Sequence, residues 1–203
     1  GEGKTLRKSF IDGKLTSSKT DGSDKLALVR SLGETKKAEG HLLLGYDDLY
    51  SIQYFGENLR PYWNRNGNET IQSQFAKADK EYDAVMDKCA AFDANLMKEA
   101  TEVGGRKYAE LCALAYRQAI AAHKLVEAPN KDLLFLSKEN FSNGSIGTVD
   151  ITYPSAPLFL VYNPELAKGL MNHIFYYSES GKWNKPFAAH DVGTYPLANR
   201  QTY

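Results

Sequence analysis

Apolar side chains between residues 71 and 96 recur at alternating intervals of four and three residues. Because an α-helix completes a turn every 3.6 residues, this spacing places all of them on one face of a single long helix. Either Asn68 or Thr70 is suited to cap its first turn, and Gly104-Gly105 is expected to end it. The residues of this face are Ile71, Phe75, Ala78, Tyr82, Val85, Cys89, Phe92 and Leu96.

A second helix is expected directly after the glycine pair, and the two would form an antiparallel hairpin. Its apolar face contains Tyr108, Leu111, Cys112, Ala115, Tyr116, Ala119 and His123. Residues 133–136 form a short apolar run that is either a strand or extended chain. A third helix is predicted around residues 154–162, and Asn163 followed by Pro164 marks the start of a fourth. The sequence therefore predicts about four helices between residues 70 and 180, with long loops at one end.

The first 56 residues have a different pattern, with short alternating stretches at 6–11, 26–31, 41–46 and 50–55. Turn-forming pairs such as Asp12-Gly13 and Asp21-Gly22 separate them. Four such strands cannot readily enclose a core, so we interpret residues 1–56 as the end of an N-terminal β-sandwich region. Residues 57–203 are assigned to a helical domain.

Composition excludes some classes of function. The 203 residues carry 25 basic and 25 acidic side chains, without the net positive charge expected of a nucleic-acid-binding protein. The longest apolar runs, such as 156–162, are too short to cross a bilayer. Cys89 and Cys112 are expected to be buried thiols, with a disulfide between the two helices as the alternative. Neither has metal-ligand spacing, and no metal or cofactor is expected.

Two polar loops are the candidates for a functional site. Residues 186–196 contain His190 and Asp191 between two prolines and a glycine, in a segment that cannot easily form regular structure. Residues 138–150 contain Glu139, Asn140 and Asp150 between apolar runs. Carboxylate-bearing loops at one end of a helical framework are typical of a hydrolase.

Each candidate also has a purely structural interpretation. Glu139 could cap a helix or form a salt bridge near its loop, and Asp150 could be the N-cap of the following helix. A direct His190–Asp191 pair is not expected, because an aspartate next in sequence to a histidine usually points elsewhere. We therefore predict that His190 contacts the ligand and that Asp191 is either a second contact or a hydrogen-bond acceptor that fixes the loop.

Aromatic side chains offer walls for such a cleft. Tyr153 and Tyr195 are candidates for contact with substrate, and so are Trp63 and Trp183, although ordinary packing is the stronger interpretation for both tryptophans. His123 is expected to be a core histidine. The sequence contains no S-x-x-K, G-x-S-x-G or H-E-x-x-H motif and no phosphate-binding loop. An amidase built from these residues would therefore use water activated by a carboxylate.

Several long stretches of the chain resemble the glutaminase A-like family of bacterial and fungal hydrolases. These stretches are 46–55, 107–124, 137–143, 148–158 and 175–203. The resemblance implies an N-terminal β-sandwich region followed by an (α/α)6 toroid of six helical hairpins. The fold class is thus mainly α, and the chain is expected to be a fragment, from a bacterial member, that ends within the toroid.

A shorter likeness concerns the residues of the two loops. The segment Thr148-Val149-Asp150, followed forty residues later by His190-Asp191, looks like a pattern in toroidal retaining β-glucosidases of the non-lysosomal glucosylceramidase type. That likeness implies Glu139 as nucleophile and His190 and Asp191 as sugar contacts. The Phe-His-Tyr of that motif is replaced here by Ile151-Thr152-Tyr153, so the likeness favours a common cleft more than a common substrate.

Three hypotheses follow. In the first, the chain is part of a glutaminase that hydrolyses the side-chain amide of glutamine. Glu139 or Asp150 activates water, Asp191 completes the catalytic group, and Asn140, Tyr153, His190 and Tyr195 bind the substrate. In the second it is a glycoside hydrolase, and in the third an inactive fragment or structural module. The expected partners are a small molecule, glutamine or a sugar, and the remainder of its own polypeptide. The resemblance implies a periplasmic or extracellular location.

Overall fold

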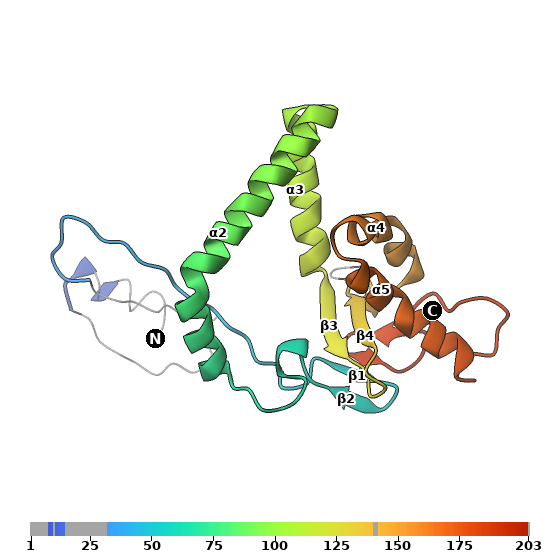
Figure 1. Ribbon diagram of the computed structural model, residues 1–203. Coiled ribbons are helices and arrows are strands. Elements are labelled where there is room, and N and C mark those ends of the chain that lie inside the picture. Colours follow the sequence, from blue (N-terminus) through green and yellow to red (C-terminus); the bar gives the residue numbers. More distant parts are fainter. Residues whose placement is uncertain (1–7, 10, 15–31, 140–141, 203) are drawn as a thin grey trace. The chain divides into compact units, whose positions relative to one another are not determined.

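The structure is a computed structural model that describes residues 8–9, 11–14, 32–139 and 142–202 (Figure 1). The chain separates into two units, Gly1–Leu42 and Leu43–Tyr203. In the first unit, Lys8, Ser9 and Ile11 are helical and residues 32–42 have no regular secondary structure. All elements described below belong to the second unit.

The N-terminal strands were predicted less well than the helices. Of the four expected strand segments, only 50–55 contains one, namely β1 (Ile52–Tyr54). Residues 41–46 form neither helix nor strand, residues 8, 9 and 11 of the first segment are helical, and 26–31 lies outside the described residues. Alternation of apolar and polar residues favours a strand only where a neighbouring strand is available to pair with it. The expectation of strands at 6–11 and 41–46 is therefore wrong for the residues described.

The long helix α2 (Ile71–Gly104) is confirmed, and its first residue is the first residue of the apolar repeat. Of the two candidate caps, Thr70 is the one used. Its hydroxyl accepts a hydrogen bond from Ser73 N, and Ser73 Oγ accepts one from Thr70 N, both at 3.1 Å. This reciprocal pair satisfies two backbone donors that the first turn leaves free. Gly105, with φ +79°, then joins α2 to α3 (Arg106–Ala121), and the two helices pack as a hairpin.

Most of the apolar face of this hairpin is not covered by the described residues. Leu96 is the one buried side chain of α2, and Ala109 is the one buried side chain of α3. Phe92, Tyr116 and Tyr162 of α4 form a small aromatic cluster with ring centroids 4.9–5.4 Å apart. Cys89 is exposed, Cys112 is half-buried, and both thiols are free. The expectation of buried thiols is wrong for Cys89, because little packs against this part of α2.

After α3 the chain forms a β-hairpin, β3 (His123–Glu127) and β4 (Leu133–Ser137). The sequence predicted the apolar run of β4 but extended the preceding helix through His123, which instead begins β3. The imidazole of His123 stacks on Phe135 at a centroid distance of 4.4 Å, and its Nδ1 lies 2.5 Å from the carbonyl oxygen of Ala119. His123 is thus packed against aromatic rings but only half-buried, and its Nε2 has no hydrogen-bond partner among the described residues, so the expectation of a core histidine is met only in part.

Two further helices follow, α4 (Val149–Tyr162) and α5 (Pro164–Glu179). The predicted start of α5 is confirmed, since the side chain of Asn163 accepts a hydrogen bond from Leu166 N. Helix α4 begins five residues before the predicted start at Pro154, and Thr148 rather than Asp150 occupies the N-cap position. Proline usually marks a helix start, but here Pro154 and Pro157 both lie inside the helix.

The remaining strands form a small sheet in the order β2-β1-β7-β6-β5. Strand β2 (Glu57–Leu59) forms a hairpin with β1, and β5 (Ser145–Ile146), β6 (Gly193–Thr194) and β7 (Leu197–Ala198) complete the sheet. Strand β1 pairs in parallel with β7. The predicted boundary between residues 56 and 57 thus falls in the β1–β2 turn, and both sides of it lie in one sheet. The division of domains at this point stays a prediction.

The main core lies between this sheet, the β3–β4 hairpin and α5. Its buried residues are Ile52, Tyr54, Leu59, Val126, Ala128, Leu134, Leu136, Ile146, Tyr177, Ala189, Val192 and Ala198. A second cluster, of Phe135, Phe159, Ala167 and Leu170, joins β4 to α4 and α5. Ala189 and Val192 anchor the His190-Asp191 loop in the main core, so this loop is held by packing on both sides.

A buried histidine lies beneath the β5–α4 connection. His173 of α5 has no exposed surface, and its Nε2 lies 3.1 Å from the carbonyl oxygen of Gly147. Burial is the largest influence on this imidazole and lowers its pKa from 6.5 to about 4. A Cβ atom on Gly147 would approach Nε2 to 2.6 Å. His173 therefore packs as a neutral ring directly under the chain that leads to Asp150.

This burial predicts a pH-dependent stability. The unfolded chain protonates His173 below pH 6.5, whereas the folded chain does so only below about 4, so stability is lost as the pH falls between these values. The loss attributable to His173 is about 3 kcal/mol at pH 4. Urea unfolding at pH 7, 5.5 and 4 measures it, and His173→Gln should lose less stability than the wild type over this interval. Equal losses in the two proteins would contradict the assignment.

Candidate active site

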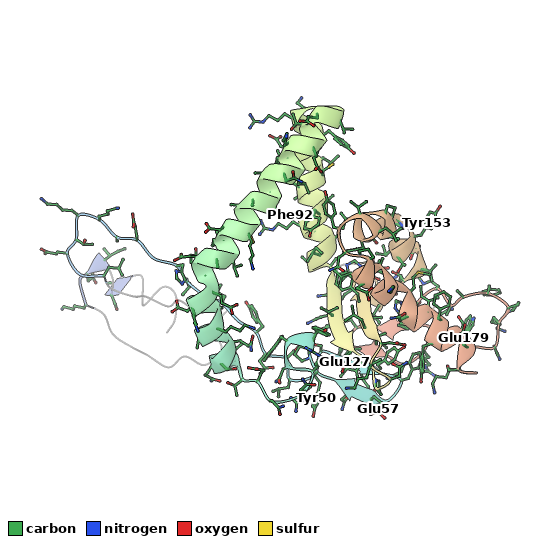
Figure 2. The ribbon with its side chains drawn as sticks, in the orientation of Figure 1. Tyr50, Glu57, Phe92, Glu127, Tyr153 and Glu179 are labelled. Carbon is green, nitrogen blue, oxygen red and sulfur yellow. The ribbon has the colours of Figure 1, made fainter. Side chains whose placement is uncertain are left out.

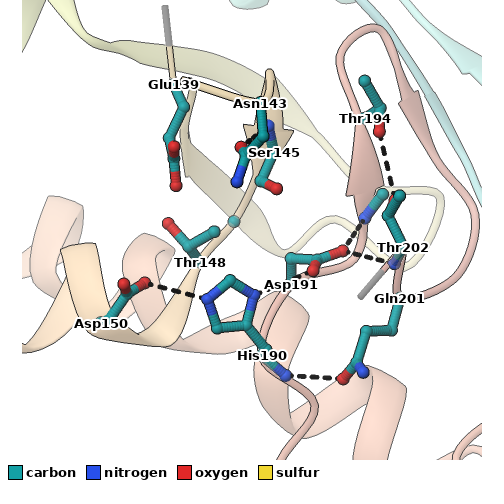
Figure 3. A network of polar contacts seen from close by, with 12 residues as sticks. Glu139, Asn143, Ser145, Thr148, Asp150, His190, Asp191, Thr194, Gln201 and Thr202 are labelled. Atoms are coloured by element: carbon teal, nitrogen blue, oxygen red, sulfur yellow. Dashed lines mark hydrogen bonds and ion pairs between the residues drawn. The ribbon is translucent and has the colours of Figure 1, made fainter. Parts of the chain in front are cut away.

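The two polar loops singled out in the sequence lie side by side (Figure 3). Strands β5 and β6 pair antiparallel, with Ser145 opposite Thr194 and Ile146 opposite Gly193. Val149 N donates to the carbonyl oxygen of His190 at 2.9 Å, which fixes the start of α4 against the second loop. Gly193 makes the tight return of this loop possible: its φ is +148°, and a Cβ would lie 1.9 Å from the carbonyl oxygen of Leu197.

His190 and Asp191 form a direct pair, contrary to the expectation from their adjacency. His190 Nδ1 lies 2.9 Å from Asp191 Oδ2. The other carboxylate oxygen of Asp191 accepts hydrogen bonds from the backbone N–H groups of Gly193 and Thr202, both at 2.9 Å. The loop turns back at Gly193, and these two donors hold the carboxylate in place beneath the imidazole.

Asp191 has no solvent-exposed side-chain surface. Its two oxygens already accept hydrogen bonds from three donors, so neither oxygen is available to a substrate. Of the roles considered for it, loop fixation and orientation of His190 agree with this geometry, whereas direct contact with substrate does not. We therefore treat Asp191 as a positioning residue.

The opposite edge of the imidazole faces a second carboxylate. His190 Nε2 lies 3.6 Å from Asp150 Oδ1 in the first turn of α4. The backbone N–H of His190 donates to Gln201 Oε1 at 2.8 Å. The hydrogen bond to Asp191 is the largest of the influences that raise the pKa of His190, and the charges of Asp150, Asp191 and Glu139 raise it further against partial burial. These contacts thus stabilise the positively charged form of His190 relative to an isolated histidine.

Glu139 and Asp150 occupy the edge of this cluster, with Glu139 on the strand side (Figure 3). Glu139 is half-buried, its Oε2 accepts a hydrogen bond from Ser142 Oγ, and its backbone N–H donates to Ser145 O at 3.0 Å. Asp150 is 64% exposed. The N-cap interpretation of Asp150 is wrong, since Thr148 holds that position. Asn140 lies outside the described residues.

Buried hydroxyl groups near the site were not found by sequence reasoning. Ser137 Oγ accepts a hydrogen bond from Thr148 N at 3.1 Å, which ties the end of β4 to the start of α4. The hydroxyls of Ser145 and Thr152 are buried without a hydrogen-bond partner in the described part of the chain. The one available signal was the polar residue directly after the apolar run of β4, at Ser137.

The predicted aromatic contacts lie outside the polar cluster. Tyr153 is 84% exposed on α4. The ring of Tyr195 has Lys138 Nζ at 5.1 Å and Lys124 Nζ at 5.8 Å from its centroid and packs against the main core. Trp183 packs against Tyr177 and donates to the carbonyl oxygen of Phe187, and Trp63 is half-buried in the short 3-10 helix η1 (Tyr62–Asn64). Packing therefore accounts for Trp183, and substrate contact by the two tyrosines stays a prediction.

Comparison with known proteins identifies the family. Residues 105–203 match the model of the glutaminase A six helical-hairpin domain, and residues 1–99 match a domain of unknown function, DUF5127. Glutaminase A from Aspergillus oryzae is 32% identical over 178 residues, which cover 85% of this chain and 26% of that protein. The chain belongs to the glutaminase A-like family. The cluster around His190 thus lies in the part of the chain that matches the six-hairpin domain.

A second relative of this glutaminase A-like chain is a "Probable glutaminase" from Arthroderma benhamiae. It is 32% identical over 104 residues, which cover 51% of this chain and 12% of the relative. No solved structure gave a match. Both relatives are fungal, so they lend no support to a bacterial source. The chain spans about a quarter of the length of the Aspergillus protein, and the two family models divide it between residues 99 and 105.

The four helices α2–α5, preceded by β1 and β2, agree with the predicted fold class of a six-hairpin helical domain. No helix in the described part of the chain has both the length and the apolar character needed to cross a membrane. Among the described residues, no group of three or more histidine, cysteine, aspartate or glutamate side chains is arranged to hold a metal ion.

Proposed function

We propose that this chain contributes a catalytic cluster to an amidohydrolase that converts the side-chain amide of glutamine to glutamate and ammonia. The observation that carries the proposal is the orientation of His190, which buried Asp191 holds at Nδ1 while Nε2 faces Asp150 at 3.6 Å. Glutamine is chosen as the proposed substrate because the relatives are named glutaminase. An acid positioned beside accessible carboxylates is an arrangement that hydrolysis of an amide by water can use.

The chemistry assigns separate roles to these groups. Glu139 or Asp150 takes a proton from water as the water oxygen attacks the carboxamide carbon. The C–N bond then breaks, and the departing nitrogen takes up a proton to leave as ammonia. The imidazolium of His190 is suited to donate a proton from Nε2 to the carbonyl oxygen or to the departing nitrogen, since its raised pKa favours the protonated form.

The position of Asp191 supports the assignment of His190 as proton donor and of Glu139 or Asp150 as base. A buried carboxylate that accepts from Nδ1 fixes which face of the ring points outward and favours the charged imidazolium. Two backbone donors hold the carboxylate, so its orientation does not depend on substrate. The half-buried Glu139 and the exposed Asp150 remain accessible, and either can serve as the base.

The direct test is ammonia release from glutamine by the full-length polypeptide that contains this chain, compared with Glu139→Gln and Asp150→Asn. We expect at least one of these variants to lose about 100-fold or more in kcat/KM. Glu165→Gln is the matched control, because Glu165 also lies in the first turn of a helix but pairs with Lys168 at 2.7 Å, apart from the cluster.

The outcomes separate the hypotheses. If folded wild-type protein releases no ammonia from glutamine, the proposal is wrong. Turnover of aryl glycosides with a sugar trapped on Glu139 would then favour a glycoside hydrolase with Glu139 as nucleophile. Activity that survives both substitutions would show that the base is not in these loops.

A periplasmic or extracellular location is part of the same proposal, and fractionation of cells that express the full-length protein tests it.

A further inference from the structure

A pocket of about 240 Å³ lies between the β1–β2 hairpin, the β3–β4 turn and α5. It shares no residue with the cluster around His190. Its lining includes the aromatic residues Tyr54, Phe55 and Tyr176 and the polar residues Glu57, Asn130 and Asp132. Figure 2 labels Glu57, at the β2 edge of this region. The volume lies just below the range typical of small-molecule sites.

The apolar wall of this pocket is a group of three rings. The ring centroids of Tyr54, Phe55 and Tyr176 lie 4.8–5.4 Å from one another. Phe55 sits at φ +46°, a left-handed conformation that is costly for a bulky side chain and that asparagine or glycine would adopt more easily in this two-residue turn. The turn itself does not favour phenylalanine at this position. The contacts of the Phe55 ring with the other two rings explain its presence better.

Tyr54 forms part of the pocket wall. Tyr54 is 4% exposed as a residue, but its hydroxyl is not among the buried polar atoms that lack a hydrogen-bond partner. Burial raises the pKa of Tyr54, and the nearby Tyr176 and the charge of Asp132 raise it further. Because Asp132 also lines the pocket, the hydroxyl lies on the pocket side of the ring. A ligand in the pocket can donate a hydrogen bond to this hydroxyl in place of water.

The rim of the pocket is negatively charged. Glu57 and Asp132 are exposed there, and Asp132 Oδ2 accepts a hydrogen bond from Asn130 Nδ2 at 2.7 Å. Of the neighbouring cations, Lys131 is paired with Glu127 at 2.8 Å. Lys182 Nζ lies 5.8 Å from the ring centroid of Phe55, so this ring already accepts an ammonium group on one side.

We propose that this pocket binds a small organic cation, namely an ammonium group on a flat apolar body. The apolar body would lie against the three rings, and the ammonium group would lie between the carboxylates of Glu57 and Asp132. The hydroxyl of Tyr54 would accept a hydrogen bond from the ammonium group. An anion of the same shape would meet two carboxylates, so the site distinguishes ligands by charge.

The test measures dissociation constants by ligand-observed NMR titration of the full-length protein with 2-phenylethylammonium. The matched ligands are 2-phenylethanol, which is neutral, and 3-phenylpropionate, which is an anion. The ammonium compound should bind most tightly, and the anion least. Of the three ligands, only the ammonium compound should bind more weakly when salt is added, because salt screens its attraction to the charges at the exposed rim.

Substitutions identify the groups responsible. The double variant Glu57→Gln/Asp132→Asn should weaken binding of the ammonium compound about 3- to 10-fold and leave 2-phenylethanol unchanged. Tyr54→Phe should weaken it about 2- to 10-fold, since it removes the hydroxyl that would accept a hydrogen bond from the ligand. Lys182→Gln should strengthen it slightly, and Glu165→Gln on α5 should have no effect.

Equal affinity for the ammonium compound and 2-phenylethanol would overturn the proposal and leave only an apolar pocket. Absence of saturable binding by a folded protein would overturn it as well. The same holds if the double variant binds the ammonium compound as tightly as the wild type. None of these results depends on glutaminase activity, because the pocket and the His190 cluster have no residue in common.

Discussion

Replacing His190 with glutamine is expected to lower kcat/KM for ammonia release from glutamine by about 10²- to 10⁴-fold. When it is protonated, His190 places a positive charge between Asp150 and Asp191. Glutamine retains a hydrogen-bond donor but cannot donate a proton. The fold should tolerate the change, because the side chain is 42% exposed and its backbone N–H still donates to Gln201.

His41→Gln is the matched control, since it makes the same substitution in a segment that is not one of the two loops of the cluster. It should leave kcat/KM unchanged. The two variants should unfold within about 0.5 kcal/mol of the wild type, as expected for exposed positions. Full activity in the His190 variant would remove this residue from the mechanism, and a large loss of stability would show that its contribution is structural.

Asp191→Asn is expected to reduce kcat by about 10²- to 10⁴-fold through the orientation of His190. The amide retains an oxygen that can accept hydrogen bonds from the backbone N–H groups of Gly193 and Thr202, so the loop should keep its conformation. With that oxygen engaged, its NH2 group faces His190 Nδ1, which no longer has a carboxylate to donate to. The neutral imidazole becomes more favourable, and the supply of imidazolium at neutral pH falls.

The pH profile separates positioning from simple destabilisation. In the wild type the pKa of His190 is raised, chiefly by Asp191, so activity that needs the imidazolium falls as the pH rises through this value. In the Asp191→Asn protein this limb should move to lower pH. An unshifted limb would contradict the positioning role. Asp191→Ala should unfold more easily by about 1–3 kcal/mol for each buried N–H left without an acceptor.

The helices could be predicted because their signals are local. The four-three repeat from Ile71, the Thr70 cap and the Asn163-Pro164 start all depend on residues within one or two turns. The strands carry no such signal, because β5, β6 and β7 are two residues long and are defined by partners distant in sequence. The same limit led to the unconfirmed strands before residue 50.

The sequence also located the two loops of the cluster but not their internal geometry. Proline, glycine and isolated charges marked 138–150 and 186–196 as unusual segments. The position of the Asp191 carboxylate beside His190 depends on the conformation of Gly193. It also depends on a hydrogen bond from the backbone N–H of Thr202, eleven residues away. The pocket at Tyr54 was not foreseen, because its walls come from β1, the β3–β4 turn and α5, and their approach depends on the whole packed core.

The parallel pairing of β1 with β7 has a consequence for how this polypeptide folds during synthesis. Gln53 and Tyr54 pair with Leu197 and Ala198, so about 140 residues must leave the ribosome before the sheet can close. The α2–α3 hairpin and the β3–β4 hairpin depend on neighbours in sequence and can form earlier. Until β7 arrives, β1 exposes an unpaired edge and the apolar side chains of Ile52 and Tyr54. The nascent chain is therefore most prone to aggregation just before the segment that carries His190 and Asp191 has been completed.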